Sequence, residues 1–366
     1  MKPVDAVGLT PYGFDEAVQA LWNAHEGEGD VLGRVAAEHR GAYSVYTASG
    51  AWDAVLTGRL VHELEQGLGS RPAVGDWVVL TGRPEEGTAV IHGMLPRRSV
   101  LRRKAAGRAV QEQVVAANMD WVLLLMGCEH DLNPRRLERY LVAAWDSGAR
   151  PVVVLTKADL AEDVEALLAE VRRVSGDAPV HAISSHTGQG VEELEAYLAG
   201  NRTVALTGSS GVGKSTLVNR WLPEDARATQ ELREDGRGKH TTTHRELVVR
   251  PTGGLVIDTP GMRELGLLEA EEGLSQTFAD VTALIAACRF RDCGHEREAG
   301  CAVRQALVMG ELEQARWNSY LKLQREQAHL ERQRQQQQQK QTQRRAPKQE
   351  KPGRRRRSWD EGEDEA

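Results

Sequence analysis

The sequence has no long uninterrupted apolar segment. No run approaches the roughly 18 residues that a membrane-spanning helix needs, and the first residues, MKPVDAVGLTPYGFDEAV, carry acids and no continuous apolar stretch of a signal peptide. Cysteine is scarce, with four in 366 residues. These absences argue against membrane-spanning and secreted classes, so we expect a cytoplasmic protein without a membrane partner.

An overall excess of positive charge is also missing. The formal net charge is −6, and 27% of residues are charged, which is typical of an ordinary soluble protein and not of a uniformly basic nucleic-acid binder. Basic residues do cluster between Arg97 and Arg108 and again near the C-terminus. Any contact with RNA is therefore expected to be local.

The chain length favours two or three domains. After an N-terminal extension at 1–30, residues 31–111 show short alternating stretches broken by Gly, Pro and Asp. This pattern predicts a small antiparallel β-barrel of the OB type, although spacing alone does not separate it from other small barrels. Residues 112–268 alternate apolar runs with helical patterns, which predicts an α/β domain with a mostly parallel sheet.

The C-terminal part of the chain changes character twice. Residues 269–333 are helical in pattern and contain three of the four cysteines, whereas 334–366 form a basic, glutamine-rich tail that we expect to be disordered. The polar segment that begins at Ser319 has helix-forming composition without an apolar stripe. It is either an exposed helix or disordered.

A phosphate-binding loop follows the apolar strand TVALTG. The segment GSSGVGKS satisfies G-x-x-x-x-G-K-[ST] between a strand and a helix. Glycines let backbone amides converge on a phosphate, the lysine neutralises phosphate charge during catalysis, and the serine hydroxyl binds Mg²⁺. The expected nucleotide-binding residues here are Gly208, Ser209, Ser210, Gly211, Val212, Gly213, Lys214, Ser215 and Thr216.

Two further segments predict contacts with Mg²⁺ and the γ-phosphate. In LVIDTPG, Asp258 ends an apolar strand and Gly261 follows three positions later. In GRGKHTTTHREL, one of the threonines 241–243, of which we take Thr242, is expected to complete the Mg²⁺ coordination. The alternative is that this threonine run only begins the next strand.

Base recognition is predicted near LTKAD. The carboxylate of Asp159 can accept hydrogen bonds from both donors on the guanine edge, which adenine lacks, while Lys157 lies over the ring. HAISSHTGQG, with Ser184 and Ser185, offers a platform for the guanine oxygen. The competing interpretation is that Asp159 only caps a helix.

Taken together, these motifs resemble the circularly permuted GTPases of the ribosome small-subunit-dependent GTPase A family. Ordinary GTPases carry the phosphate loop first, whereas this chain has the order TKAD, SSHTG, GSSGVGKST, HTTT, DTPG. The resemblance implies an N-terminal OB fold, a permuted GTPase domain in the middle and a zinc domain after it. It extends to about residue 330, within the boundaries above.

The chain departs from common GTPase motifs at two positions. Thr156 replaces an asparagine in the guanine motif, which removes an amide that would brace the phosphate loop. Met262 follows DTPG where Ras-like enzymes place a water-orienting glutamine. A thioether cannot orient water, so we expect slow intrinsic hydrolysis, with His240 as the candidate catalytic residue that replaces the glutamine.

The cysteine-rich segment CRFRDCGHEREAGC has the spacing C-x₄-C-x-H-x₅-C. Three thiolates and one imidazole form a closed tetrahedral site, which predicts one structural Zn²⁺. The expected ligands are Cys288, Cys293, His295 and Cys301. Several arginines lie around this segment and are candidates for rRNA contacts, although a solvated charged surface explains them almost as well: Arg289, Arg291, Arg297 and Arg304.

These patterns, with the resemblance, lead to one expected function and one alternative. The expected function is a monomeric GTPase that uses GTP with Mg²⁺, is stimulated by the small (30S) ribosomal subunit, contacts its 16S rRNA and dissociates after hydrolysis late in maturation. The alternative is an RNA-binding assembly module that holds GTP as a structural ligand with little turnover. An ATPase is disfavoured by TKAD and SSHTG.

Overall fold

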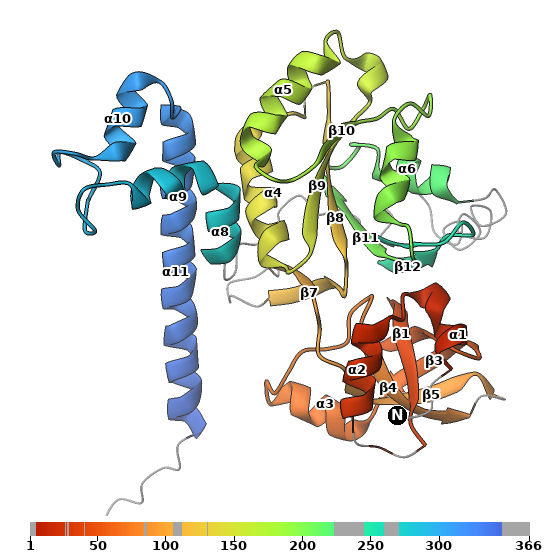
Figure 1. Ribbon diagram of the computed structural model, residues 1–366. Coiled ribbons are helices and arrows are strands. Elements are labelled where there is room, and N and C mark those ends of the chain that lie inside the picture. The colour runs from red at the N-terminus through yellow and green to blue at the C-terminus, as the bar shows by residue number, and fades with distance from the viewer. Residues whose placement is uncertain are drawn as a thin grey trace, which may run out of the picture.

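The chain folds into a β-barrel, an α/β domain and a helical domain, in that order along the sequence (Figure 1). The computed structural model describes residues 5–25, 27, 29–39, 41–83, 86–104, 112–129, 131–222, 245–259 and 271–345. In the described part of the chain, none of the helices is both long and apolar enough to cross a membrane.

The N-terminal barrel has five strands and is closed. The strands are β1 (Val31–His39), β2 (Ala42–Thr47), β3 (Gly50–Leu56), β4 (Trp77–Arg83) and β5 (Thr88–Met94). Their order is β1-β2-β3-β5-β4, and β4 pairs back to β1. The β3–β5 pair is parallel, and helix α3 (Gly58–Glu65) lies between β3 and β4 in the chain. The predicted OB-type barrel is confirmed.

Short helices from the N-terminal extension pack against the barrel. These are α1 (Ala6–Leu9), η1 (Thr10–Tyr12) and α2 (Glu16–Ala24). Leu9, Val18 and Trp22 are buried together with Trp77 and Leu95 of the barrel region. The extension thereby covers one side of the barrel.

The central domain contains a mixed sheet with five parallel strands. Its strands are β8 (Trp121–Gly127), β9 (Arg150–Thr156), β10 (Val180–Ala182), β11 (Thr203–Gly208), β12 (Glu246–Val249) and β13 (Leu255–Asp258). The order is β10-β9-β8-β11-β13-β12, and only β12 runs antiparallel. Strand β11, which precedes the phosphate loop, lies between β8 from earlier in the chain and β13 from later.

Helices cover both faces of this sheet because its strands are apolar on both sides. Alternate residues of β8 enter two different cores, Leu124 on one face and Leu125 on the other. Helices α4 (Pro134–Asp146) and α5 (Val164–Ser175) cover the first face. The other face is covered by α6 (Lys214–Trp221) and by the 3₁₀ helix η4 (Val191–Tyr197).

A two-stranded hairpin lies between the barrel and the central sheet. It consists of β6 (Val100–Lys104) and β7 (Glu112–Ala117), which pair antiparallel. The domain boundary that we placed between residues 111 and 112 therefore falls between two paired strands. The barrel itself closes with β5.

Arg34 ties the barrel to the elements around it. Its guanidinium donates to the carbonyl oxygens of Tyr12 (2.6 Å), Gly75 (3.2 Å) and Asn118 (2.9 Å). The residue is 1% exposed, and burial lowers the pKa of Arg34 to about 10. Strand β1 also pairs with β12 at Ala37, so the barrel strands continue the central sheet.

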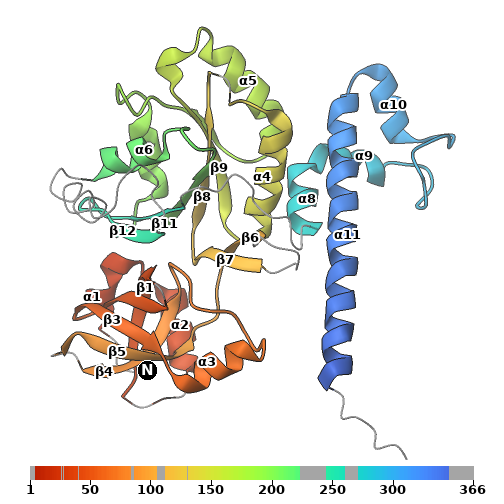
Figure 2. The same cartoon turned by 180° about the vertical axis from the view of Figure 1, so that it is seen from behind.

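The C-terminal domain is helical and lies beside α4, as both views show (Figures 1 and 2). Its helices are α8 (Glu271–Thr277), α9 (Ala279–Ala286), α10 (Ala302–Met309) and α11 (Gln314–Arg345). Gly273 of α8 approaches α4 so closely that a Cβ there would lie 2.2 Å from the Val142 carbonyl oxygen. The polar segment after Ser319 is helical, and α11 runs past residue 333, where we placed the start of the tail.

A network of charged residues, centred on the buried Glu138 and Arg316, holds α11 against α4. Glu138 of α4 is fully buried and contacts Arg316 (3.0 Å) and the Ser319 hydroxyl (2.5 Å). Arg316 also binds both carboxylate oxygens of Asp280 at 2.6 and 2.7 Å. Because a buried charge is costly without partners, this network specifies how the helical domain docks on the central domain.

Candidate nucleotide-binding site

The phosphate loop joins the carboxyl end of β11 to α6. Gly208, Gly211 and Gly213 all have positive φ, at 153°, 78° and 102°, which other residues adopt only with strain. A Cβ on Gly208 would also lie 2.5 Å from the Leu125 carbonyl oxygen of β8. The loop therefore needs glycine both for its backbone shape and for its close approach to the neighbouring strand.

Lys214 begins helix α6 and folds back over the loop. Its ammonium group donates to the carbonyl oxygens of Gly208 (2.8 Å) and Ser209 (2.7 Å). Burial lowers the pKa of Lys214, while the carboxylates of Asp258 and Asp131 raise it. The Lys214 ammonium group, which is expected to bind phosphate, thus lies against the start of the loop. Ser215 and Thr216 are exposed in the first turn of α6.

The guanine motif touches the phosphate loop directly. Thr156 ends β9, and its hydroxyl donates to the Val212 carbonyl oxygen at 2.7 Å and contacts the Met126 carbonyl oxygen at 3.3 Å. We expected the replacement of asparagine by threonine to remove a brace from the phosphate loop. The structure corrects this expectation, because the buried hydroxyl of Thr156 makes the connection itself.

Asp159 lies close to Ser184 on the neighbouring loop. A hydrogen bond from the Ser184 side chain is the main cause that lowers the pKa of Asp159, and the nearby His186 and Lys157 lower it further. Asp159 lies within η3 (Ala158–Leu160), which has no side-chain cap, and Asp163 caps α5. The helix-capping interpretation of Asp159 is therefore wrong, and its carboxylate stays exposed and ionised.

The other residues predicted to lie near the guanine base are also polar. Lys157 has positive φ (59°) and pairs with Glu129 at 3.1 Å, a partner that sequence reasoning missed. The Ser185 hydroxyl oxygen is buried and has no hydrogen-bond partner in the described part of the chain, which is costly unless a ligand satisfies it. Arg220 of α6 donates to the Ser185 carbonyl oxygen at 3.3 Å, which links this loop to the helix after the phosphate loop.

Asp258 ends β13 beside the phosphate loop and is 7% exposed. Its neighbour Thr259 donates a hydrogen bond to the Leu206 carbonyl oxygen of β11, so the end of β13 is held against the strand that carries the loop. The threonines 241–243 (Thr242 among them), His240, Gly261 and Met262 lie outside the described residues.

Four of the five expected fragments thus meet at one edge of the sheet: TKAD, SSHTG, GSSGVGKS and the aspartate of DTPG. Fragments far apart in the chain become neighbours because β11, which carries the phosphate loop, lies between β8 from earlier in the chain and β13 from later. The arrangement can hold a guanine base at one end and a polyphosphate at the other.

Comparison with known proteins agrees with this geometry. A family model described as RsgA GTPase matches residues 94–268. The small ribosomal subunit biogenesis GTPase RsgA of Opitutus terrae is 48% identical over 334 residues, which cover 88% of this chain and 91% of that protein. RsgA 2 of Lactiplantibacillus plantarum, described in the same words, is 47% identical over 324 residues, covering 88% and 90%. The chain belongs to the RsgA GTPase family.

Solved structures of RsgA relatives have the same fold. YjeQ from Thermotoga maritima aligns with a TM-score of 0.60 at 30% identity, over 80% of this chain and 97% of that chain. YloQ, titled a circularly permuted GTPase, aligns with a TM-score of 0.57 at 25% identity, over 81% and 95%. The expected enzyme class, GTPase, and the circular permutation are both confirmed, so GTP with Mg²⁺ is the nucleotide that this site must accommodate.

The fold brings the cysteine cluster together as a set of four potential metal ligands. The four potential ligand atoms, from Cys288, Cys293, His295 and Cys301, all lie within 4.8 Å of one another. The Nδ1 atom of His295 is 3.5 Å from the Cys288 sulfur and 3.6 Å from the Cys301 sulfur. Ordinary Zn–S and Zn–N bonds of about 2.3 and 2.0 Å at tetrahedral angles imply S–N and S–S edges of about 3.5 and 3.8 Å, so the donor set fits Zn²⁺.

The basic segments divide into paired and exposed residues. Arg97 binds the buried Asp76 at 2.6 Å and Arg98 binds Asp15 at 2.6 Å, so both arginines are paired within the fold. The arginines around the cysteine cluster, in contrast, are exposed: Arg289, Arg291, Arg297 and Arg304. The first group therefore faces carboxylates within the fold, whereas the second group faces solvent.

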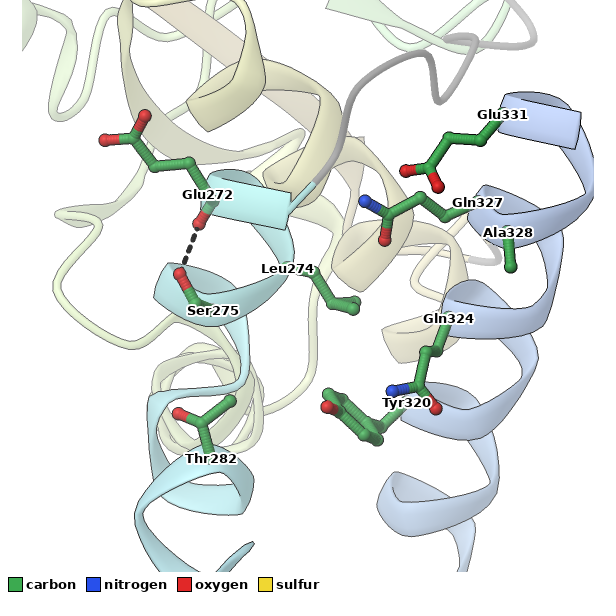
Figure 3. A pocket seen from close by; sticks show the side chains of 9 residues that line it. All are labelled: Glu272, Leu274, Ser275, Thr282, Tyr320, Gln324, Gln327, Ala328 and Glu331. Carbon is green, nitrogen blue, oxygen red and sulfur yellow. Dashed lines mark hydrogen bonds between the residues drawn. The ribbon is translucent and has the colours of Figure 1, made fainter. Parts of the chain in front are cut away.

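A cavity of about 670 Å³ lies in the helical domain, away from the nucleotide motifs. Figure 3 shows its lining from α8, α9 and α11, with Leu274 and Tyr320 pointing into the space between the helices. None of the residues that line it belongs to the nucleotide motifs. On its other side, α8 packs closely against α4 at Gly273.

Proposed function

We propose that this chain is a small ribosomal subunit biogenesis GTPase whose slow hydrolysis of GTP accelerates on the 30S subunit and which dissociates after hydrolysis. The observation that supports it most is the direct hydrogen bond between the guanine motif and the phosphate loop, from Thr156 to Val212. It joins the two parts of a GTP site in a chain whose relatives are named small ribosomal subunit biogenesis GTPases.

Within this function, the site residues have distinct roles. The base is read by Asp159, with Thr156, Lys157, Ser184 and Ser185 around it. The loop amides from Gly208 to Gly213 surround the phosphates, and Lys214 neutralises charge on the β- and γ-phosphates. The residues that hold Mg²⁺ are Ser215, Asp258 and Thr242, with Gly261 at the γ-phosphate.

The attacking water requires a group that Met262 cannot supply. We assign this role to His240, next to the threonine run, when the chain is bound to the ribosomal subunit. His240→Ala is then expected to lose most of the subunit-stimulated rate while GTP binding is retained. His244→Ala, four positions later, serves as the matched control, and an unchanged stimulated rate for His240→Ala would exclude this assignment.

The other proposed contacts concern zinc and RNA. Cys288, Cys293, His295 and Cys301 hold one structural Zn²⁺, because the site offers four protein ligands and no open position. The exposed arginines of the same domain bind 16S rRNA phosphates, so binding to the subunit weakens steeply as salt is raised. The protein acts as a monomer in the cytoplasm.

Phosphate release from GTP, with and without purified 30S subunits, tests the proposal. We expect slow release alone, a large increase with subunits, and no release by Lys214→Ala under either condition. If wild-type protein binds both GTP and the subunit but shows no increase, the chain is instead an assembly module that holds GTP as a structural ligand. ATP, which lacks the donors read by Asp159, provides the nucleotide control.

A further inference from the structure

Asp131 lies in the turn between β8 and α4 and contacts the phosphate loop, although it is not part of the loop motif. Its carboxylate accepts a hydrogen bond from the Ser209 hydroxyl at 2.5 Å. Ser209 is the first residue after Gly208 in the loop, at a position where the motif allows any residue. The motif therefore assigns no partner to this serine, and only the fold provides one.

Asp131 is itself held in place by helix α4 and strand β8. Arg136, in the first turn of α4, donates to the second carboxylate oxygen at 2.6 Å and also to the Asp131 carbonyl oxygen. The Gly127 amide at the end of β8 lies 3.4 Å from the oxygen that Ser209 uses. The side chain is 26% exposed, so it is partly shielded from water.

Ser209 is consequently held at two points. Its side chain binds Asp131, and its carbonyl oxygen accepts the Lys214 ammonium group at 2.7 Å. A residue held at both ends cannot rotate freely, so the backbone next to Gly208 stays in one conformation. Such preorganisation lowers the entropy that the loop loses when it closes around phosphates.

We propose that Asp131 is a positioning residue for GTP binding, which acts through Ser209 and does not itself contact the nucleotide. It fixes the first turn of the phosphate loop to helix α4. This role rests on the proposed function of the loop itself. It concerns affinity for the diphosphate part of the nucleotide, because that is the part that the loop amides surround.

Equilibrium binding of fluorescent GDP and GTP analogues to the full-length chain tests this role. Asp131→Ala and Ser209→Ala are each expected to weaken binding of both nucleotides by about tenfold or more, the size expected for one hydrogen bond to a charged group. The double variant is expected to be no weaker than either single variant, because both changes remove the same interaction. Ser209→Thr keeps the hydroxyl and is expected to restore most of the affinity.

Two controls separate this role from general stability and from the proposed function. Asp163→Ala removes the cap of α5, where Asp163 accepts from the Ala166 amide at 2.9 Å, and is expected to lower stability without changing nucleotide affinity. If Lys214→Ala abolishes binding but Asp131→Ala leaves it unchanged, the positioning role is wrong. Additive losses in the double variant would also overturn it, whereas wild-type binding by Lys214→Ala would refute the phosphate loop itself.

Discussion

The hydroxyl of Thr156 joins base recognition to phosphate binding, and Thr156→Val tests that link. Valine has nearly the same shape as threonine but cannot donate a hydrogen bond. Thr156 is 1% exposed, and its hydroxyl is 2.7 Å from the Val212 carbonyl oxygen. The substitution therefore removes one buried hydrogen bond with little change in packing.

The expected effect follows from the acceptor that remains. Without Thr156, the Val212 carbonyl oxygen loses its donor inside the protein, and an unsatisfied buried acceptor costs about 1 to 3 kcal/mol. Part of this cost appears as a freer phosphate loop. We expect GDP and GTP affinity to fall by about 5- to 50-fold, which corresponds to about 1 to 2.3 kcal/mol.

Thr207→Val is the matched control for this experiment. Thr207 is fully buried in β11, directly before the phosphate loop, and its hydroxyl has no hydrogen-bond partner within the described residues. Removing an unpaired buried hydroxyl is expected to leave affinity unchanged and to raise stability slightly. The reasoning is refuted if Thr156→Val binds GDP like the wild type, or if both variants lose the same affinity.

Four other changes probe base recognition, the zinc domain and the domain interface. Asp159→Asn replaces an acceptor by a donor, so GTP affinity should fall and XTP affinity should rise in competition assays; unchanged preference would contradict the role of Asp159. Ser184→Ala removes the hydrogen bond that lowers the pKa of Asp159, so this pKa should rise in the variant. Because only the ionised carboxylate accepts both hydrogen bonds from guanine, GDP affinity should begin to drop at a higher pH than in the wild type. Cys293→Ser should lower the zinc content measured by elemental analysis and loosen the helical domain to proteolysis, and full zinc retention would exclude Cys293 as a ligand. Arg316→Met leaves the buried carboxylate of Glu138 with fewer partners and should cost about 3 kcal/mol in denaturant unfolding, so wild-type stability would show that the network is not needed.

Many residues of the nucleotide-binding site were predictable because they occur in short local sequence motifs. The three glycines of the phosphate loop determine its backbone, and Lys214 follows them at a fixed distance. The cysteine and histidine spacing likewise predicts a four-ligand cluster, which the fold brings within 4.8 Å. Short alternating stretches were enough to predict the barrel, and apolar runs that alternate with helical patterns were enough to predict the mostly parallel sheet.

Other parts were misjudged because they depend on residues far apart in the chain. Thr156 was expected to weaken the site, yet its partner Val212 lies 56 positions later and becomes visible only when β9 and β11 pack on either side of β8. Arg97 and Arg98 belonged to a basic segment considered for RNA contacts, but the fold pairs them with Asp76 and Asp15.

What the sequence determined by itself is the set of chemical groups and the local backbone that presents them, since glycine, lysine and cysteine impose those properties wherever they occur. Only the tertiary structure decided which groups meet: Thr156 with the phosphate loop, Asp131 with Ser209, Glu138 with Arg316. The physical reason is that such contacts depend on how strands and helices pack. Packing depends on the whole core, which no short segment of the chain contains.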